Sequence, residues 1–460
     1  MKQLTYTLLL LATVLWASAQ SPSPTPARSV PAPPLAGSSP QRFGDLPPGQ
    51  YMGPATCAAS SCHGSPAPLE NTDILQNEYD SWLHAPAPSH VKAYEVLLNP
   101  TSRRIMRNLG IRTPAERTKL CLDCHATNVP AAVQANPIEL TDGVSCESCH
   151  GPASGWIAQH VQRDWTHEQS VAAGMIDQRD VTVRARNCMS CHLGDATKTV
   201  DHYLIAAGHP LLRFELDNYT ESSLMPVHWK PHGEREYAAT ERNTHGVRAW
   251  AVGQGVAFSD SMSQLARVAG SENWPEFSVL SCDTCHHSLR DGAWRQERGY
   301  DGAPGLPHWS HSQWIVLRSI IAEVAPGEVA GLDADVRALA RTTARMTDEA
   351  RIAASARSLG SRVARLVPRI DDVTWNEARI RSMIRRAATP AENQLTDRRS
   401  AEQLTYALVS LSAQLVQENP RLVRSDIVRN IDALYEQLNT PHFPDEFNRD
   451  RFLTALARLR

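Results

Sequence analysis

A short pattern, Cys-x-x-Cys-His, occurs four times in this chain of 460 residues. Two cysteines one helical turn apart can add to both vinyl groups of one porphyrin, and the histidine that follows can bind the porphyrin iron. The four copies are Cys121–His125, Cys146–His150, Cys188–His192 and Cys282–His286. The pattern is typical of c-type haem attachment, so it predicts the cofactor, one haem for each motif and the proximal iron ligand.

A looser copy lies upstream, where four residues separate Cys57 from Cys62 and His63 follows directly. With this copy the motifs account for every cysteine of the chain, and we predict five covalently bound haems c, each with one iron. The predicted attachment residues are Cys57, Cys62, Cys121, Cys124, Cys146, Cys149, Cys188, Cys191, Cys282 and Cys285. The predicted proximal ligands are His63, His125, His150, His192 and His286.

Paired cysteines also occur in zinc sites and, in exported proteins, in disulfide frameworks. Zinc ribbons do not need a histidine directly after every second cysteine, and a disulfide framework needs none. Because all five pairs carry this histidine, we favour haem at every motif. At the Cys57/Cys62 site the wider spacing leaves a disulfide open as the alternative.

The N-terminal segment has the features of a secretory signal peptide. Lys2 precedes an apolar run that continues to Trp16, and Ala17-Ser18-Ala19 provides an A-x-A cleavage site. We predict a signal peptide over residues 1–19 and a periplasmic or extracellular mature protein; a membrane anchor is the alternative, although the run is short for a span. Residues 20–50 are rich in proline and serine with little charge, which predicts a disordered linker.

The chain changes character from residue 313 onward, where it has no cysteine and apolar residues recur at steps of three and four. The stripes are Leu332, Val336, Leu339, Thr343, Met346 and Ala350, then Leu404, Leu408, Leu411 and Leu415, then Ile427, Ile431, Leu434 and Leu438. Such stripes predict amphipathic helices with one buried face. We expect a mainly α chain, with a pentahaem cytochrome c domain over residues 51–312, in which long loops wrap stacked haems, and a C-terminal helical bundle over residues 313–460.

A local signal precedes the second motif. Thr113-Pro114-Ala115-Glu116 has the form of a capping box with proline at the first helical position. We expect it to start the helix that presents Cys121 and His125.

Other segments accompany the motifs in a pattern that resembles a known family. They are Tyr79…Trp82…His90…Ala93-Tyr94, Gly143-Val144-Ser145-Cys146 to Gly151-Pro152-Ala153, His202-Tyr203 to His209-Pro210, Met225-Pro226-Val227-His228-Trp229 and Trp274-Pro275-Glu276-Phe277. Over roughly residues 51–310 the chain resembles the exported multihaem cytochromes c of the cytochrome c-554 family. The resemblance implies an electron carrier with closely stacked haems, mostly ligated by two histidines. The five sites and the wide first spacing depart from the four-haem type member.

Thirteen of the eighteen histidines are not proximal ligands, and five of them must serve if each iron binds two imidazoles. We predict that these distal ligands are His90, His160, His202, His209 and His228, which lie in family-like segments and near a haem motif or in loops able to fold back. Each could instead be a solvated or hydrogen-bonded side chain. The reserves are His287, His308 and His311, and the histidines assigned to the surface are His84, His167, His232, His245 and His442. Nothing singles out a methionine, so bis-histidine ligation and low potentials are favoured.

The leading functional hypothesis is electron transfer outside the cytoplasm, with other cytochromes or quinol-linked membrane complexes as redox partners. Only twenty residues separate His125 from Cys146, which favours haems in close contact. The formal net charge of −3 argues against a nucleic-acid partner.

Two other functions stay open. The main alternative is a multihaem oxidoreductase that acts on a small nitrogen or sulfur compound at one open-faced haem, and no residue is assigned a catalytic role in it. The other is a structural subunit of a larger cytochrome assembly, in which the chain would self-associate.

Overall fold

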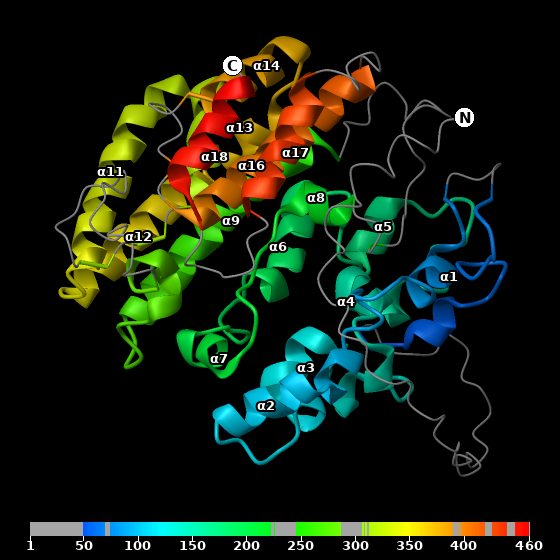
Figure 1. Cartoon of the computed structure of the whole chain (residues 1–460). Coiled ribbons are helices and arrows are strands. Elements are labelled where there is room, and N and C mark those ends of the chain that lie inside the picture. The colour runs from blue at the N-terminus through cyan, green and yellow to red at the C-terminus, as the bar shows by residue number, and fades with distance from the viewer. Residues whose placement is uncertain are drawn as a thin grey trace, which may run out of the picture.

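The computed structural model describes residues 49–69, 74–221, 225, 245–286, 306–307, 309–310, 312–389, 395, 397–418, 426–438 and 447–459. This part of the chain is built of helices (Figure 1), and its only pairings of extended segments are two isolated bridges, Tyr51 with Gln134 and Leu280 with Trp309. The prediction of a mainly α chain is confirmed. The predicted signal peptide, most of the linker, and His228, His287, His308 and His311 lie outside the described residues.

Short helices joined by long irregular segments make up the N-terminal part. In chain order they are η3 (Pro54–Cys57), α1 (Glu78–Leu83), η4 (Glu95–Leu98), α2 (Pro100–Asn108), η5 (Ala115–Arg117), α3 (Lys119–His125), η6 (Ala131–Val133), η7 (Leu140–Asp142), α4 (Cys146–His150), η8 (Ala153–Gly155), α5 (His167–Ala172), α6 (Val181–His192), α7 (His202–Ala207) and α8 (Leu216–Thr220). From η3 to α5, and in α7, the buried apolar side chains form small separate clusters of three to five residues. This region therefore lacks a large apolar core of its own.

The helix that carries the second motif begins later than its capping signal predicts. Residues 115–117 form the short 3-10 helix η5, and α3 begins only at Lys119. The Thr118 hydroxyl donates to the carbonyl of Pro114 at 2.7 Å, and Thr118 itself is extended, with φ −102° and ψ 121°. The expectation that the box starts this helix was wrong, because the chain closes one turn and then extends again before α3.

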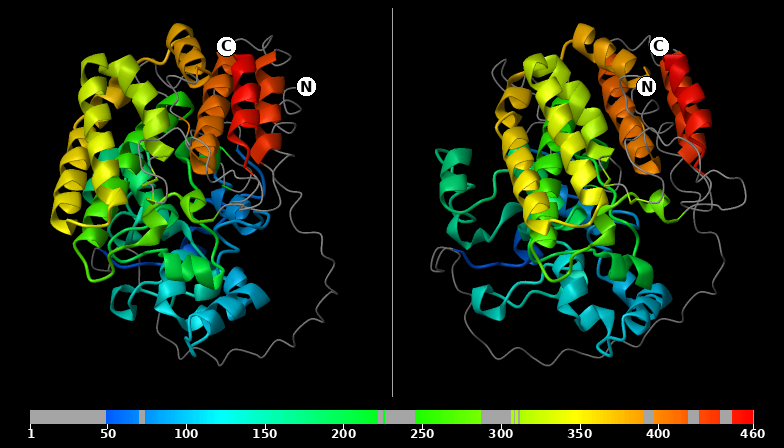
Figure 2. Two further views of the ribbon diagram at one scale, coloured as in Figure 1. Left: turned by 60° about the vertical axis from the view of Figure 1, so that its left-hand side comes forward. Right: turned by 90° about the vertical axis from the view of Figure 1, so that its left-hand side faces the viewer.

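Longer helices build the other half of the molecule (Figures 1 and 2). They are α9 (Val247–Ala269), α10 (Ser312–Val324), α11 (Pro326–Ala344), α12 (Glu349–Ala364), α13 (Val367–Asp372), α14 (Glu377–Ala387), α16 (Arg398–Glu418), α17 (Asp426–Leu438) and α18 (Arg449–Leu456), with the short 3-10 helices η9 (Phe277–Val279), η10 (Cys282–Thr284) and η13 (Ala457–Leu459). One hydrophobic core runs through the long helices. Helix α6 contributes Val181, Ala185 and Met189 to it, and α9 contributes Trp250 and Phe258. The expected domain boundary after residue 312 thus lies inside one core.

The predicted apolar stripes are buried as expected in the C-terminal helices. Leu332, Val336, Leu339 and Thr343 are buried in α11, and the leucine stripe of α16 is buried too. The first stripe does not continue through Met346 and Ala350, because α11 ends at Ala344 and Met346 takes a positive φ of 52°. Among the described residues, no helix combines the length and the apolar character that a membrane span requires.

Candidate haem-binding site

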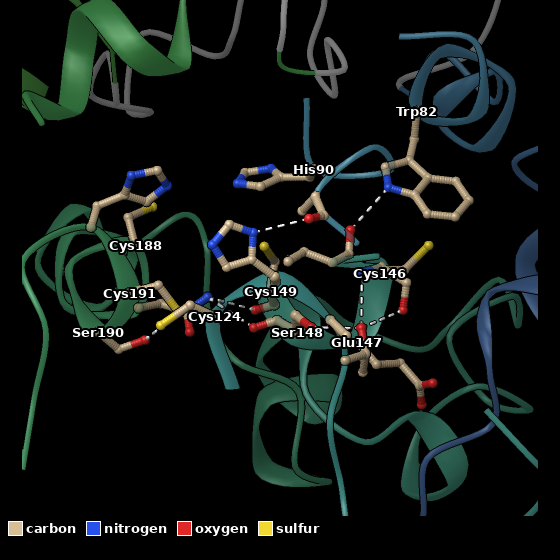
Figure 3. A pocket seen from close by; sticks show the side chains of 18 of the residues that line it. Trp82, His90, Cys124, Cys146, Glu147, Ser148, Cys149, Cys188, Ser190 and Cys191 are labelled. Carbon is tan, nitrogen blue, oxygen red and sulfur yellow. Dashed lines mark hydrogen bonds between the residues drawn. The ribbon is translucent and has the colours of Figure 1, made fainter. Parts of the chain in front are cut away.

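A large cavity lies among the N-terminal helices, and its volume is about 2240 Å³. Pockets for one drug-sized ligand have volumes of about 300–1,000 Å³, so this cavity has room for several groups of that size. The motif residues that line it are Cys57, Cys62, His63, Cys121, Cys124, His125, Cys146, Cys149, His150, Cys188, Cys191 and His192. Figure 3 shows Cys149, Cys188 and Cys191 projecting from α4 and α6 near His90. The fold therefore brings four motifs to one hollow space.

Local helical structure orients the thiols of each motif. Helices α3, α4 and α6 all end at the proximal histidine, so both cysteines of each motif lie on one helix face. In the first motif a turn takes up the two extra residues: the Cys62 N–H donates to the carbonyl of Ala59 at 2.8 Å, and the His63 N–H donates to that of Cys57 at 3.2 Å. The wide spacing at Cys57 and Cys62 is therefore compatible with haem attachment, as predicted for the regular motifs.

Three pairs of histidine rings lie close together in this region. The distances between ring centres are 6.3 Å for His63 and His160, 6.0 Å for His90 and His192, and 6.4 Å for His125 and His209. A metal ion bound by two imidazole nitrogens, each at about 2 Å, holds the ring centres roughly 6 Å apart. Each pair joins one proximal histidine to one predicted distal ligand. The spacing fits an iron between the two rings of every pair.

The second nitrogen of several of these rings is held by a backbone carbonyl. The contacts of Nδ1 are with Ala93 for His125 (2.9 Å), with Ile157 for His160 (2.7 Å) and with Pro210 for His209 (2.7 Å). A ring that donates its Nδ1–H keeps a lone pair on Nε2, the form in which histidine binds a metal. His63 differs, because its Nδ1 lies 2.9 Å from the Glu78 carboxylate.

Burial keeps most of these rings neutral. It lowers the pKa of His192 to about 4, with the nearby His90 and His125 acting in the same direction. Burial is also the main cause that lowers the pKa of His90, His125, His160 and His209. The hydrogen bond that His63 donates to the Glu78 carboxylate instead raises the pKa of His63. Burial thus favours the neutral form of the other five rings of the three pairs, which is the form in which an imidazole binds a metal.

The alternatives to haem find little support in the geometry. All ten cysteines lie in the described residues, and none forms a disulfide. Among the described residues, no group of three or more His, Cys, Asp or Glu side chains could hold a metal ion directly. A structural zinc site needs four such ligands in one place. Histidine pairs spaced for one metal, with cysteines on the cavity wall, fit a metal held inside a tethered macrocycle.

The spatial order of the motifs differs from their order in the sequence. Three contacts join them: the thiols of Cys57 and Cys146, the Asn187 amide with the Cys149 carbonyl at 3.3 Å, and the Cys191 thiol with the Asp123 carbonyl at 3.9 Å. The first contact joins the first and third motifs, the second joins the third and fourth, and the last joins the fourth and second. These three contacts link the motifs in the order first, third, fourth, second.

The remaining predicted ligands lie elsewhere. His202 begins α7 and is not on the cavity wall; its ring lies 5.5 Å from Phe277, in the segment that precedes the fifth motif. Cys285 and His286 of that motif are exposed. His245, which was expected at the surface, is only 8% exposed and lies 3.3 Å from Glu221. That expectation was wrong, because the start of α9 packs this side chain against the end of α8.

Sequence reasoning missed two buried glutamates at the site. Glu147, inside the third motif, is 2% exposed and accepts the backbone N–H groups of Met52, Gly53 and Ala153, each at 2.8 Å. Glu78 holds the ring of His63. The available signals were weak: one glutamate lies between two attachment cysteines, and the other directly precedes Tyr79 of the family-like pattern.

Comparison with known proteins agrees with this geometry. Residues 56–151 match the family model described as cytochrome c554 and c-prime, a range that holds the first three motifs. No curated protein and no solved structure matches the chain significantly. The family implies covalently bound haem c with iron and haem-based electron transfer. The resemblance predicted from the sequence is confirmed over residues 56–151, and this part of the chain is cytochrome c554-like.

Proposed function

We propose that the protein carries electrons through five covalently bound c-type haems outside the cytoplasm. The observation that carries the proposal is the set of three histidine pairs, each spaced for one iron, beside a cavity lined by eight attachment cysteines. Two imidazoles on one iron leave no open position for a substrate, which suits electron transfer better than catalysis. Redox proteins, such as other cytochromes or quinol-linked membrane complexes, are the proposed partners.

The histidine pairs suggest which residues hold each haem. His63 and His160 would bind the first iron, His125 and His209 the second, and His192 and His90 the fourth. His150 and His286 are the proposed proximal ligands of the third and fifth haems, and His202 and His228 remain the proposed distal ligands. The bound haem supplies one-electron redox chemistry. The chain's own contribution is to hold the ligand rings, keep them neutral and shield them from water.

The contacts between motifs suggest the path of the electrons. Since residues within or directly beside the motifs touch in the order first, third, fourth, second, each haem would have a close neighbour on this path. The fifth motif, at η10, is not on the cavity wall in the described part of the chain. We therefore propose a continuous path through four haems, with the fifth extending it toward the surface.

The number of haems in the exported protein tests the proposal. Intact mass spectrometry and a pyridine haemochrome assay should give five haems on a chain that begins at Gln20. A variant with both Cys121→Ser and Cys124→Ser should lose one haem and keep the others. A mass equal to that of the bare polypeptide would refute haem attachment altogether.

The spin state of the haem irons distinguishes an electron carrier from an enzyme. Electron paramagnetic resonance of the oxidised protein should show low-spin iron, and the reduced protein should not bind carbon monoxide. A substantial high-spin fraction that binds carbon monoxide or nitrite would favour the multihaem oxidoreductase instead.

A further inference from the structure

The ring of His63 has a different partner from the rings of His125, His160 and His209. Its Nδ1 lies 2.9 Å from Oε2 of Glu78, whereas the Nδ1 atoms of His125, His160 and His209 lie against backbone carbonyls. A carboxylate accepts a proton more strongly than a carbonyl does, and the hydrogen bond to it is charge-assisted. The first site therefore has an electronic feature that these other sites lack.

The structure holds Glu78 firmly in this position. Its side chain is 8% exposed, and its other oxygen, Oε1, accepts the backbone N–H of Gln76 at 3.1 Å. The next residue, Tyr79, donates its N–H to the carbonyl of His63 at 2.8 Å. Helix α1 and the first motif are thus joined at two places, so the carboxylate and the ring stay aligned.

We propose that Glu78 is a positioning residue that makes the first haem the one with the lowest reduction potential among the three with paired histidines. The inference rests on the proposed function. When Nε2 of His63 binds iron, the proton stays on Nδ1 and is shared with Glu78, which makes the ring a more basic ligand. A more basic ligand stabilises ferric iron over ferrous iron, and this lowers the potential.

The position of the first site relates this difference in reduction potential to the direction of electron flow. The site lies at one end of the order first, third, fourth, second. It is also open to solvent: the His63 side chain is 32% exposed, and Val161, next to His160, is 67% exposed. An electron delivered by a partner at this end would pass along this order to the fourth and second haems, which the proposal gives a higher potential than the first. The first haem is therefore the site where electrons arrive.

The ring planes provide a spectroscopic label for the first haem. The planes of His63 and His160 are nearly parallel, at 7°, whereas the angles in the other two pairs are 67° and 84°. Low-spin ferric haem with parallel imidazole planes gives a rhombic electron paramagnetic resonance signal, and perpendicular planes give a signal dominated by one large g value. Among the three haems with paired histidines, the rhombic signal therefore reports on the first.

The test is a redox titration of the intact pentahaem protein, followed through these signals. In the parent protein the rhombic signal should disappear at the lowest potential of the three. In Glu78→Gln, which keeps the side-chain shape and removes the charge, it should disappear at a higher potential, with the other signals and the haem content unchanged. Asp80→Asn is the matched control, because its carboxylate lies 3.2 Å from Nδ1 of His84, a histidine that is 69% exposed and is not on the cavity wall. That variant should leave every potential unchanged.

Two results would overturn the inference. One is a parent protein in which the rhombic signal titrates above the other two, a result that needs no variant to fold. The other is a Glu78→Gln protein with full haem content and an unchanged rhombic potential. Both differ from failure of the proposed function, in which no low-spin haem signal would be present at all.

Discussion

At the scale of single residues, the presence of one distal imidazole determines the spin state of one iron. The two histidines of each pair come from distant parts of the chain, and His209 is held independently of His125, by the carbonyl of Pro210. If one ring is removed, the partner ring and both thioether bonds remain. The haem should then stay attached while its coordination changes.

Replacement of His209 by alanine tests the pairing with His125. We expect an unchanged haem count and the conversion of one iron from low spin to high spin, with new carbon monoxide binding at that iron. The measurement is electron paramagnetic resonance with spin quantitation. His84→Ala is the control, since the His84 side chain is 69% exposed and pairs only with Asp80 in the described structure. A His209→Ala protein that stays entirely low-spin would reject the pairing.

Local patterns explain why the attachment residues could be predicted and other site residues could not. Thioether attachment needs two thiols and a histidine within one turn, so the whole signal lies in a few consecutive residues. The pairing of His63 with His160 depends on how the chain returns to the cavity, which no short window records. Glu78 and Glu147 are buried because of hydrogen bonds to distant partners, whereas glutamate in a sequence ordinarily indicates an exposed position.

At the scale of elements, the close approach of two helices joins the C-terminal helices to α9. A Cβ atom added at Gly360 of α12 would lie 2.8 Å from Cβ of Met262 in α9 and 3.2 Å from the carbonyl oxygen of Ser259. Met262 is fully buried, and α9 lies in the same core as α6, the helix that ends at His192. The contact between α9 and α12 therefore supports the helix that carries the fourth motif.

Alanine at Gly360 should destabilise the protein, because either the helices or the Met262 side chain must shift. Overpacking of this kind costs about 1–3 kcal/mol. Gly327→Ala, in the first turn of α11, is the matched control: its added Cβ meets nothing within 4 Å, so the change should be neutral or stabilise by about 0.5–1 kcal/mol. Thermal unfolding of both variants measures the difference. Equal stability of the two would contradict the close approach.

At the scale of elements, some helices could be predicted from the sequence and others could not. The stripes of α11 and α16 follow from repeated apolar spacing, which tertiary packing reinforces over many residues. The segment from Thr113 to Glu116 carries only a local signal, and the hydroxyl of Thr118 closes a separate turn there. A cap without a long periodic stretch behind it does not determine where a helix begins.

At the scale of the whole molecule, the two halves differ in what fills them. The long helices share one core with large, fully buried side chains such as Trp250, Phe258 and Trp314, whereas residues 49–172 have only small apolar clusters around the cavity. If porphyrins fill that cavity, they supply the missing apolar interior. Because α6 ends at His192 and belongs to the common core, the helices after residue 312 act as the support of the fourth motif.

A chain that ends at residue 311 tests this view of the C-terminal helices. Removal of residues 312–460 uncovers Phe258 and Met262 of α9, which lie against Trp314 of α10 and Gly360 of α12, and burial of each of these two side chains contributes about 1.5–3 kcal/mol. We expect the shortened chain to be insoluble or to be degraded, whereas the full chain expressed beside it is soluble with five haems. Size-exclusion chromatography and haem content measure the outcome. A soluble shortened chain with all five haems would instead mean that residues 51–311 fold alone, and that the shared core is dispensable for the fourth site.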